Sequence, residues 1–181
     1  IVSAAIPGDR AAIAIEAMRA GKDVMIDKPG LTSFEQLADV KKAQQETGRI
    51  FSICYSEHFR QPATVKAGEL VAAGAIGQVI NIVGLGPHRL RNHHRPDWFF
   101  ERNRYGGVIC DIASHQCAQY LFFSGDETAE VLSASVRNHA SPGRLHLLAV
   151  SMVLTAAAGG AAHATQPMRP GSLQGCVAGE F

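Results

Sequence analysis

Asp111 and His115 are the pair of residues whose types and spacing best suit proton transfer. They lie four residues apart in a segment, 108–123, that is expected to be helical, so both side chains should share one face. A carboxylate beside an imidazole fixes its tautomer and raises its basicity, which suits a general acid or base near neutral pH. Spacing by itself favours a simpler alternative, an exposed helix pair that contributes only about 0.3 kcal/mol to stability.

Lys28 is a second candidate, because it directly follows a short buried strand expected at 24–26. Pro29 restricts the preceding Lys28 to an extended conformation. A lysine held at the carboxyl end of a strand can donate a hydrogen bond to a substrate hydroxyl or stabilise developing alkoxide charge. Position alone favours a solvated loop lysine, so a role for Lys28 depends on what lies around it.

The segment 88–100 mixes basic, histidine and aromatic residues. One interpretation is a substrate loop, in which Trp98 packs on a sugar face while His88 and Arg95 reach hydroxyl or carboxylate groups. The alternative is a surface loop anchored by Trp98 and Phe99.

A metal site is a further interpretation of the histidines at 88, 93, 94 and 115, since imidazole is a common zinc ligand. The first three histidines lack the i, i+4 spacing of a helical zinc motif, and no Cys or Glu completes the set. We therefore predict no metal, and a metal-dependent hydrolase is the least favoured function.

The first 55 residues alternate short apolar strands with helical segments. We expect strands at 1–6, 24–26 and 50–55, and helices at 10–20 and 34–46, the second capped by Thr32 or Ser33. Short links between such elements give parallel βαβ units, and therefore an α/β fold. Ligands of such folds bind at the carboxyl ends of the strands, here Ile6-Pro7, Asp27-Lys28-Pro29 and Tyr55-Ser56.

The regular alternation of short strands and helices ends after residue 56. We expect a helix at 61–73, a strand at 78–85, a loop at 87–105, the helix at 108–123 and a strand at 131–136. We therefore place a domain boundary at this change. The predicted domains are 1–56, 57–140 and an atypical tail, 141–181, for which no structure is predicted. The start lacks both Met and a signal peptide and reads as the middle of a strand, so we expect the chain to begin partway through a domain.

Composition excludes several classes of protein. A net charge of +1 gives no basis for binding nucleic acid or an anionic membrane, and no apolar run is long enough to span a bilayer. The four cysteines show no CxxC spacing, which favours a reducing cytoplasmic setting.

Three segments resemble signatures of the Gfo/Idh/MocA oxidoreductases, the family of glucose–fructose oxidoreductase and inositol dehydrogenase. Residues 20–29, AGKDVMIDKP, are similar to the family's AGKHVLxEKP, and residues 106–115, GGVICDIASH, to its GGGxLxDxGxH. Residues 74–79, GAIGQV, resemble its GxIG turn. The three segments occur in the family's order within residues 1–140.

This resemblance implies the catalytic residues Lys28, Asp111 and His115, with Asp111 orienting His115. It implies NAD or NADP as cofactor, with Ile6, Pro7, Asp27, Lys28 and Pro29 around the nicotinamide. His115 would take a hydroxyl proton from a sugar, polyol or related small-molecule substrate while hydride passes to the nicotinamide. The family also implies a homo-oligomer. Its fold implies that the chain contains the C-terminal half of a Rossmann-type parallel sheet domain, followed by part of an α+β open-sheet domain.

Several positions depart from the family pattern. Asp27 replaces a Glu, and Ser56 and His58 stand where Asn and Arg are common. The glycine-rich turn that holds the cofactor pyrophosphate is expected before Ile1, and the family's later strands are not apparent after Ala140. A truncated or frame-shifted reading frame would explain both. The alternative function is therefore a non-catalytic fragment that keeps the fold and binds no dinucleotide.

Overall fold

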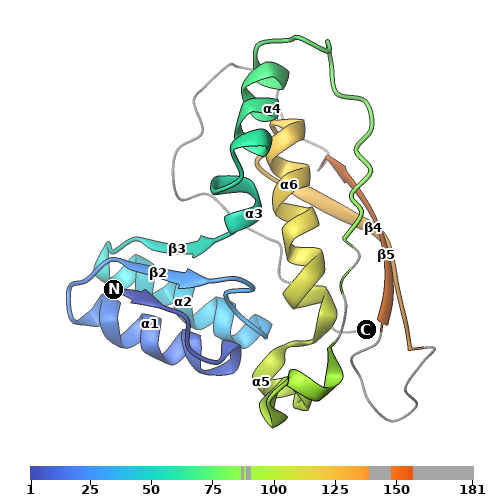
Figure 1. Ribbon diagram of the computed structural model, residues 1–181. Coiled ribbons are helices and arrows are strands. Elements are labelled where there is room, and N and C mark those ends of the chain that lie inside the picture. Colours follow the sequence, from blue (N-terminus) through green and yellow to red (C-terminus); the bar gives the residue numbers. More distant parts are fainter. Residues whose placement is uncertain (87, 89–90, 139–147, 157–181) are drawn as a thin grey trace.

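The computed structural model describes residues 1–86, 88, 91–138 and 148–156 of the 181-residue chain (Figure 1). Strands β1 (Val2–Ser3), β2 (Val24–Asp27) and β3 (Phe51–Cys54) form a parallel sheet in that order. Helices α1 (Arg10–Arg19) and α2 (Phe34–Thr47) connect the strands and lie together beneath the sheet in Figure 1. The predicted α/β fold with parallel strands is confirmed.

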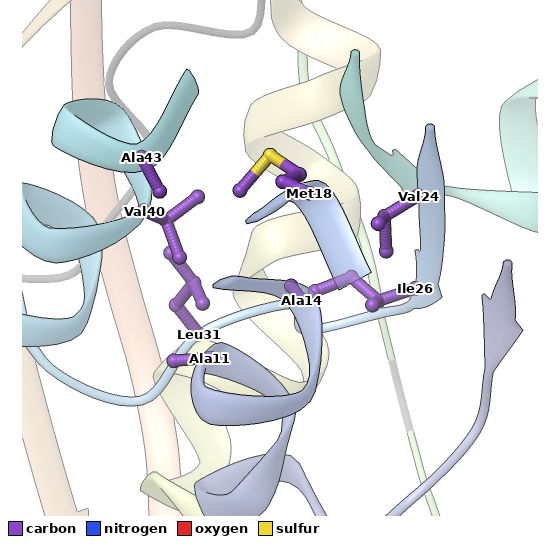
Figure 2. Packing of buried hydrophobic residues seen from close by; sticks show 8 residues of the cluster. All are labelled: Ala11, Ala14, Met18, Val24, Ile26, Leu31, Val40 and Ala43. Atoms are coloured by element: carbon purple, nitrogen blue, oxygen red, sulfur yellow. The ribbon is translucent and has the colours of Figure 1, made fainter. Parts of the chain in front are cut away.

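The core of this first unit lies between the sheet and its two helices. Met18 of α1, Ile26 of β2 and Val40 of α2 are fully buried there. Figure 2 shows these three with the remaining buried members, Ala11, Ala14, Val24, Leu31 and Ala43. Burial of each large side chain stabilises the fold by about 2 kcal/mol, so this cluster fixes how α1 and α2 meet the sheet.

The ends of α2 follow the predicted chemistry. The Ser33 hydroxyl accepts a hydrogen bond from the Gln36 amide at 3.2 Å, so Ser33 is the N-cap. The Gln36 side chain accepts from the Thr32 amide at 2.9 Å, which satisfies a second amide at the same turn. Gly48 ends the helix with φ +64°, a left-handed conformation that glycine adopts at little cost.

The chain continues into helices α3 (Ser56–Phe59) and α4 (Pro62–Ala72), which agrees with the helix predicted at 61–73. The predicted strand at 78–85 is wrong, because the described residues 78–86 form no strand. Ile80 is 94% exposed and Leu85 is 84% exposed. A β-branched sequence forms a strand only where another strand pairs with it, and the described residues offer this segment no such partner.

The segment predicted as a loop contains short helical turns. These are η2 (Asn92–His94), η3 (Asp97–Phe100) and α5 (Arg102–Tyr105). The next helix begins as a wide π turn, η4 (Ile109–Ala113), and continues as α6 (Ser114–Ser124). The predicted helix at 108–123 is therefore present, but its first turn is not an α-helix.

Strands β4 (Ala129–Asn138) and β5 (Leu148–Ala156) form an antiparallel pair with a bulge at Leu132. The predicted strand at 131–136 is confirmed and is longer than predicted, whereas β5 was not predicted. Helix α6 packs against α3 and α4 (Figure 1). In that contact His58 stacks on Phe59 and Phe122, with ring centroids 4.0 and 4.4 Å away. Among the described residues, no helix has the length and apolar character to cross a membrane.

A buried arginine ties the ends of β1 and β2 together. The Arg10 guanidinium donates to the carbonyl oxygens of Ala5 at 2.7 Å, Asp27 at 2.6 Å and Lys28 at 2.7 Å. Its side chain is only 5% exposed, so these carbonyls share a donor shielded from water. Arg10 therefore fixes the backbone from which the Lys28 side chain leaves.

Replacement of Arg10 by leucine should destabilise the fold strongly. Arg10→Leu removes the donor to three shielded carbonyls, so we expect the free energy of unfolding to fall by about 3 kcal/mol. Urea denaturation followed by circular dichroism measures this change. The control is Arg19→Leu, which removes a 63% exposed guanidinium paired with Glu46 at 3.7 Å and should cost less than about 0.5 kcal/mol. Equal losses in the two variants would contradict the structural role of Arg10.

Candidate active site

Lys28 and Asp111 are brought together from positions 83 residues apart. The Lys28 ammonium forms a salt bridge with Oδ1 of Asp111 and donates to the Asp111 carbonyl oxygen at 3.1 Å. The two side chains are 24% and 15% exposed, so water screens this pair less than it screens the surface pairs of the chain. Two of the residues singled out in the sequence therefore meet at the carboxyl end of β2.

Tyr105 completes the surroundings of the Asp111 carboxylate. Its hydroxyl donates to Oδ2 of Asp111 at 2.7 Å, so both carboxylate oxygens accept hydrogen bonds. Burial, together with the Asp111 charge and this hydrogen bond, raises the pKa of Tyr105, which keeps the phenol protonated as a donor. Sequence reasoning missed Tyr105. The available signal was Gly106 directly after it, whose φ of +85° ends α5 just before the turn that carries Asp111.

His115 is buried beside this group, at 3% exposure. Its Nε2 atom lies 3.8 Å from Oε1 of Glu57, and the Tyr55 ring meets the imidazole edge-on with centroids 6.0 Å apart. Nδ1 is buried and has no hydrogen-bond partner among the described residues.

The pKa of His115 is lowered, chiefly because burial penalises the charged imidazole. The charges of Lys28 and His88 act in the same direction, whereas Glu57 and Asp111 oppose it. His115 is therefore neutral at pH 7 and can accept a proton.

Among the described residues, no hydrogen bond joins Asp111 to His115, the residue that the resemblance expects Asp111 to orient. In the described part of the chain, the hydrogen bonds of the Asp111 carboxylate come from Lys28 and Tyr105. The helix opens here into a π turn, in which the Ser114 amide bonds to the Ile109 carbonyl five residues back. The carboxylate that forms an ion pair with His115 Nε2 is that of Glu57.

The residues expected around the nicotinamide lie near the ends of β1 and β2. Ile6 is half-buried and precedes the short turn η1 (Pro7–Asp9), in which Pro7 is buried. Asp27 is half-buried, and its Oδ1 accepts from the Lys28 amide at 3.0 Å. Pro29 is buried and follows a cis peptide bond. All four thus occupy the predicted edge of the sheet.

The residues expected to face a substrate belong to an aromatic group in the loop. The Arg95 guanidinium lies over the Phe99 ring at 4.3 Å, and Trp98 is half-buried with its ring centroid 6.0 Å from that of Phe99. Phe99 in turn packs on Tyr105 with centroids 4.0 Å apart. His88 is exposed, and its Nδ1 lies 3.1 Å from the Gly86 carbonyl. Arg95 and Trp98 are linked to Asp111 through Phe99 and Tyr105. The charge of His88 instead acts on His115.

The histidines considered for a metal site do not gather. Within the described ranges, which include all four, no three His, Cys, Asp or Glu side chains are placed to hold a metal ion. The geometry therefore gives the metal-dependent hydrolase no support. What it does assemble is a fixed ammonium group, a neutral buried imidazole and two carboxylates at one edge of a parallel sheet.

Comparison with known proteins places these residues in a family context. Residues 64–176 match the GFO/IDH/MocA C-terminal domain. The match extends past Ala140, where the sequence by itself showed no resemblance. The chain is also 31% identical over 128 residues to 1,5-anhydro-D-fructose reductase of Ensifer adhaerens, an alignment that covers 67% of this chain and 36% of the relative. With D-xylose dehydrogenase of Paenarthrobacter nicotinovorans the identity is 25% over 64% of this chain and 31% of the relative. The chain thus spans about a third of the length of these relatives.

Two solved structures share the fold of this chain. A candidate oxidoreductase from Erwinia carotovora atroseptica SCRI1043 is 40% identical, with a TM-score of 0.81 over 87% of this chain and 47% of that one. Levoglucosan dehydrogenase in complex with NADH and levoglucosan is 22% identical, with a TM-score of 0.68 over 76% of this chain and 37% of that one. At that identity the second likeness concerns the fold alone.

Loss of the Tyr105 hydroxyl should weaken the group around Asp111. In Tyr105→Phe the ring still packs on Phe99, but one carboxylate oxygen loses its donor. We expect the free energy of unfolding in urea to fall by about 1.5 kcal/mol, the scale of a hydrogen bond to a charged group. The matched control is Tyr120→Phe, at a tyrosine nine residues after Asp111 in the sequence. This control should change the free energy of unfolding by less than about 0.5 kcal/mol. A stability for Tyr105→Phe equal to the control would show that the hydrogen bond contributes nothing.

Proposed function

Because the chain belongs to the Gfo/Idh/MocA oxidoreductase family, we propose that it takes part in nicotinamide-dependent oxidation or reduction of a sugar, polyol or related hydroxy compound. The observation that carries this proposal is the Lys28–Asp111 pair beside the buried, neutral His115. Two relatives, a reductase of a fructose derivative and a xylose dehydrogenase, support this substrate class. Levoglucosan dehydrogenase, which shares the fold, is known in complex with NADH.

The described residues fit one end of a dinucleotide better than the other. Ile6, Pro7, Asp27 and Pro29 line the carboxyl edge of the sheet, and the unpaired Nδ1 of His115 is a buried polar atom near it. No glycine-rich turn follows a strand in the residues that the structure describes. These residues therefore suit the nicotinamide end of NAD or NADP, and not the pyrophosphate.

In this proposal the chain's own residues handle the proton and the developing charge. A bound nicotinamide supplies the hydride-transfer chemistry. His115 takes the proton of the substrate hydroxyl, and the Lys28 ammonium stabilises the negative charge that develops on the substrate oxygen. Asp111 holds Lys28 in place, and His88, Arg95 and Trp98 contact the rest of the substrate.

Cofactor binding is the first test. Reduced nicotinamide mononucleotide, NADH and NADPH are titrated calorimetrically into the 181-residue chain. Because the described residues suit the nicotinamide end, we expect the mononucleotide and NADH to bind with dissociation constants within about tenfold of each other, a difference of about 1.4 kcal/mol. A folded chain that binds none of the three would contradict the proposal and support the non-catalytic alternative.

The second test removes the proposed proton-handling groups. Lys28→Ala and His115→Ala should each lower turnover by about 10²-fold, the usual contribution of an acid–base group. Turnover is followed by nicotinamide absorbance with a panel of sugars and polyols. Lys22→Ala, which removes an exposed lysine in the turn after α1, is the control and should leave turnover unchanged. Full turnover in His115→Ala would remove His115 from the mechanism.

A further inference from the structure

Glu57 is a carboxylate that neither the sequence motifs nor the proposed function uses. It lies in α3, directly beyond the carboxyl end of β3, in a helix that packs against α6. Its side chain is 39% exposed, and Oε1 lies 3.8 Å from Nε2 of His115. Glu57 therefore reaches the buried imidazole from solvent, on an element different from those that carry Lys28 and Asp111.

The other carboxylate near His115 is already engaged. Asp111 accepts hydrogen bonds from Lys28 on one oxygen and from Tyr105 on the other. Its charge is offset by the Lys28 ammonium next to it. Of the charges that act on His115, Glu57 has the largest effect. The carboxylate that can respond to protonation of His115 is thus Glu57.

We propose that Glu57 is the positioning residue for His115: its carboxylate accepts the Nε2–H, so that the lone pair used for proton transfer stands on Nδ1. This inference rests on the proposed function for its catalytic meaning. The separation of 3.8 Å exceeds a hydrogen bond, and rotation of the partly exposed Glu57 side chain closes the gap. The buried Nδ1, without a partner among the described residues, is the atom then available to a substrate hydroxyl.

The proton balance shows what Glu57 contributes. During oxidation the substrate O–H bond breaks and its proton forms a bond to Nδ1, while the hydride leaves carbon for the oxidised nicotinamide. His115 becomes an imidazolium in a buried site, with the positive Lys28 nearby. The Glu57 carboxylate stabilises that imidazolium, as a carboxylate paired with a catalytic imidazole does. In reduction the same proton returns to the substrate oxygen.

The first measurement needs no cofactor. The His115 imidazole is titrated by NMR in the 181-residue chain, with its resonance assigned by its loss in His115→Gln. Glu57 raises the pKa of His115, so Glu57→Gln should lower that pKa further, and Glu57→Asp should restore part of the change. The matched control is Glu69→Gln, which removes an exposed carboxylate of α4 that pairs with Lys66. A His115 pKa in Glu57→Gln equal to that in the control would overturn the proposal.

The second measurement reads the pH profile of kcat/KM for oxidation. His115 must be neutral to accept the proton, so activity falls as pH drops through its pKa. Glu57→Gln should move this acid limb to lower pH and reduce the plateau by about 10-fold, with Glu57→Asp intermediate. A purely structural role would reduce the plateau and leave the acid limb in place, which would overturn the assignment. Failure of the proposed function appears instead as full activity in His115→Ala, while the NMR titration still decides whether Glu57 governs His115.

Discussion

The salt bridge between Lys28 and Asp111 is the interaction on which the site depends. It joins the parallel sheet to the helical segment that carries His115, and no sequence-local force would bring these two elements together. Partial burial of both side chains makes the pair costly to break, because either charge would then lie poorly solvated. The pair thus connects the part of the fold that we propose for the nicotinamide with the part that we propose for proton transfer.

The supports on either side of this pair are made of different interactions. On the sheet side, Arg10 holds the Lys28 carbonyl and so fixes where the lysine side chain begins. On the helical side, the Tyr105 hydroxyl holds Asp111, and the Tyr105 ring packs on Phe99. A change at Phe99 would reach Lys28 through three contacts: Phe99 with Tyr105, Tyr105 with Asp111, and Asp111 with Lys28. The segment that contains Phe99 and Tyr105 is therefore coupled to the site by packing and by hydrogen bonding. Its position influences where Asp111 and Lys28 lie.

The local elements of this chain could be predicted from sequence, whereas the contacts between them could not. Ser33 caps α2 as expected, because capping depends only on residues within one turn. The prediction of a strand at 78–85 was wrong, because a strand forms only where another segment of the chain pairs with it. Strand β5 was missed for the complementary reason: it pairs with β4, but its own sequence lacks a clear alternation.

The residues of the candidate site also differ in whether the sequence could identify them. Lys28, Asp111 and His115 could be found because their segments resemble family motifs. Tyr105 and Glu57 belong to no quoted motif, and each acts on a residue that lies six or more positions away in the sequence. Spacing alone suggested Asp111 as the partner of His115, but the Asp111 carboxylate accepts hydrogen bonds from Lys28 and Tyr105. The carboxylate that pairs with the His115 imidazole comes from another helix, α3. Contacts between elements, and not spacing within one motif, therefore decide which carboxylate meets the Lys28 ammonium and which meets the imidazole.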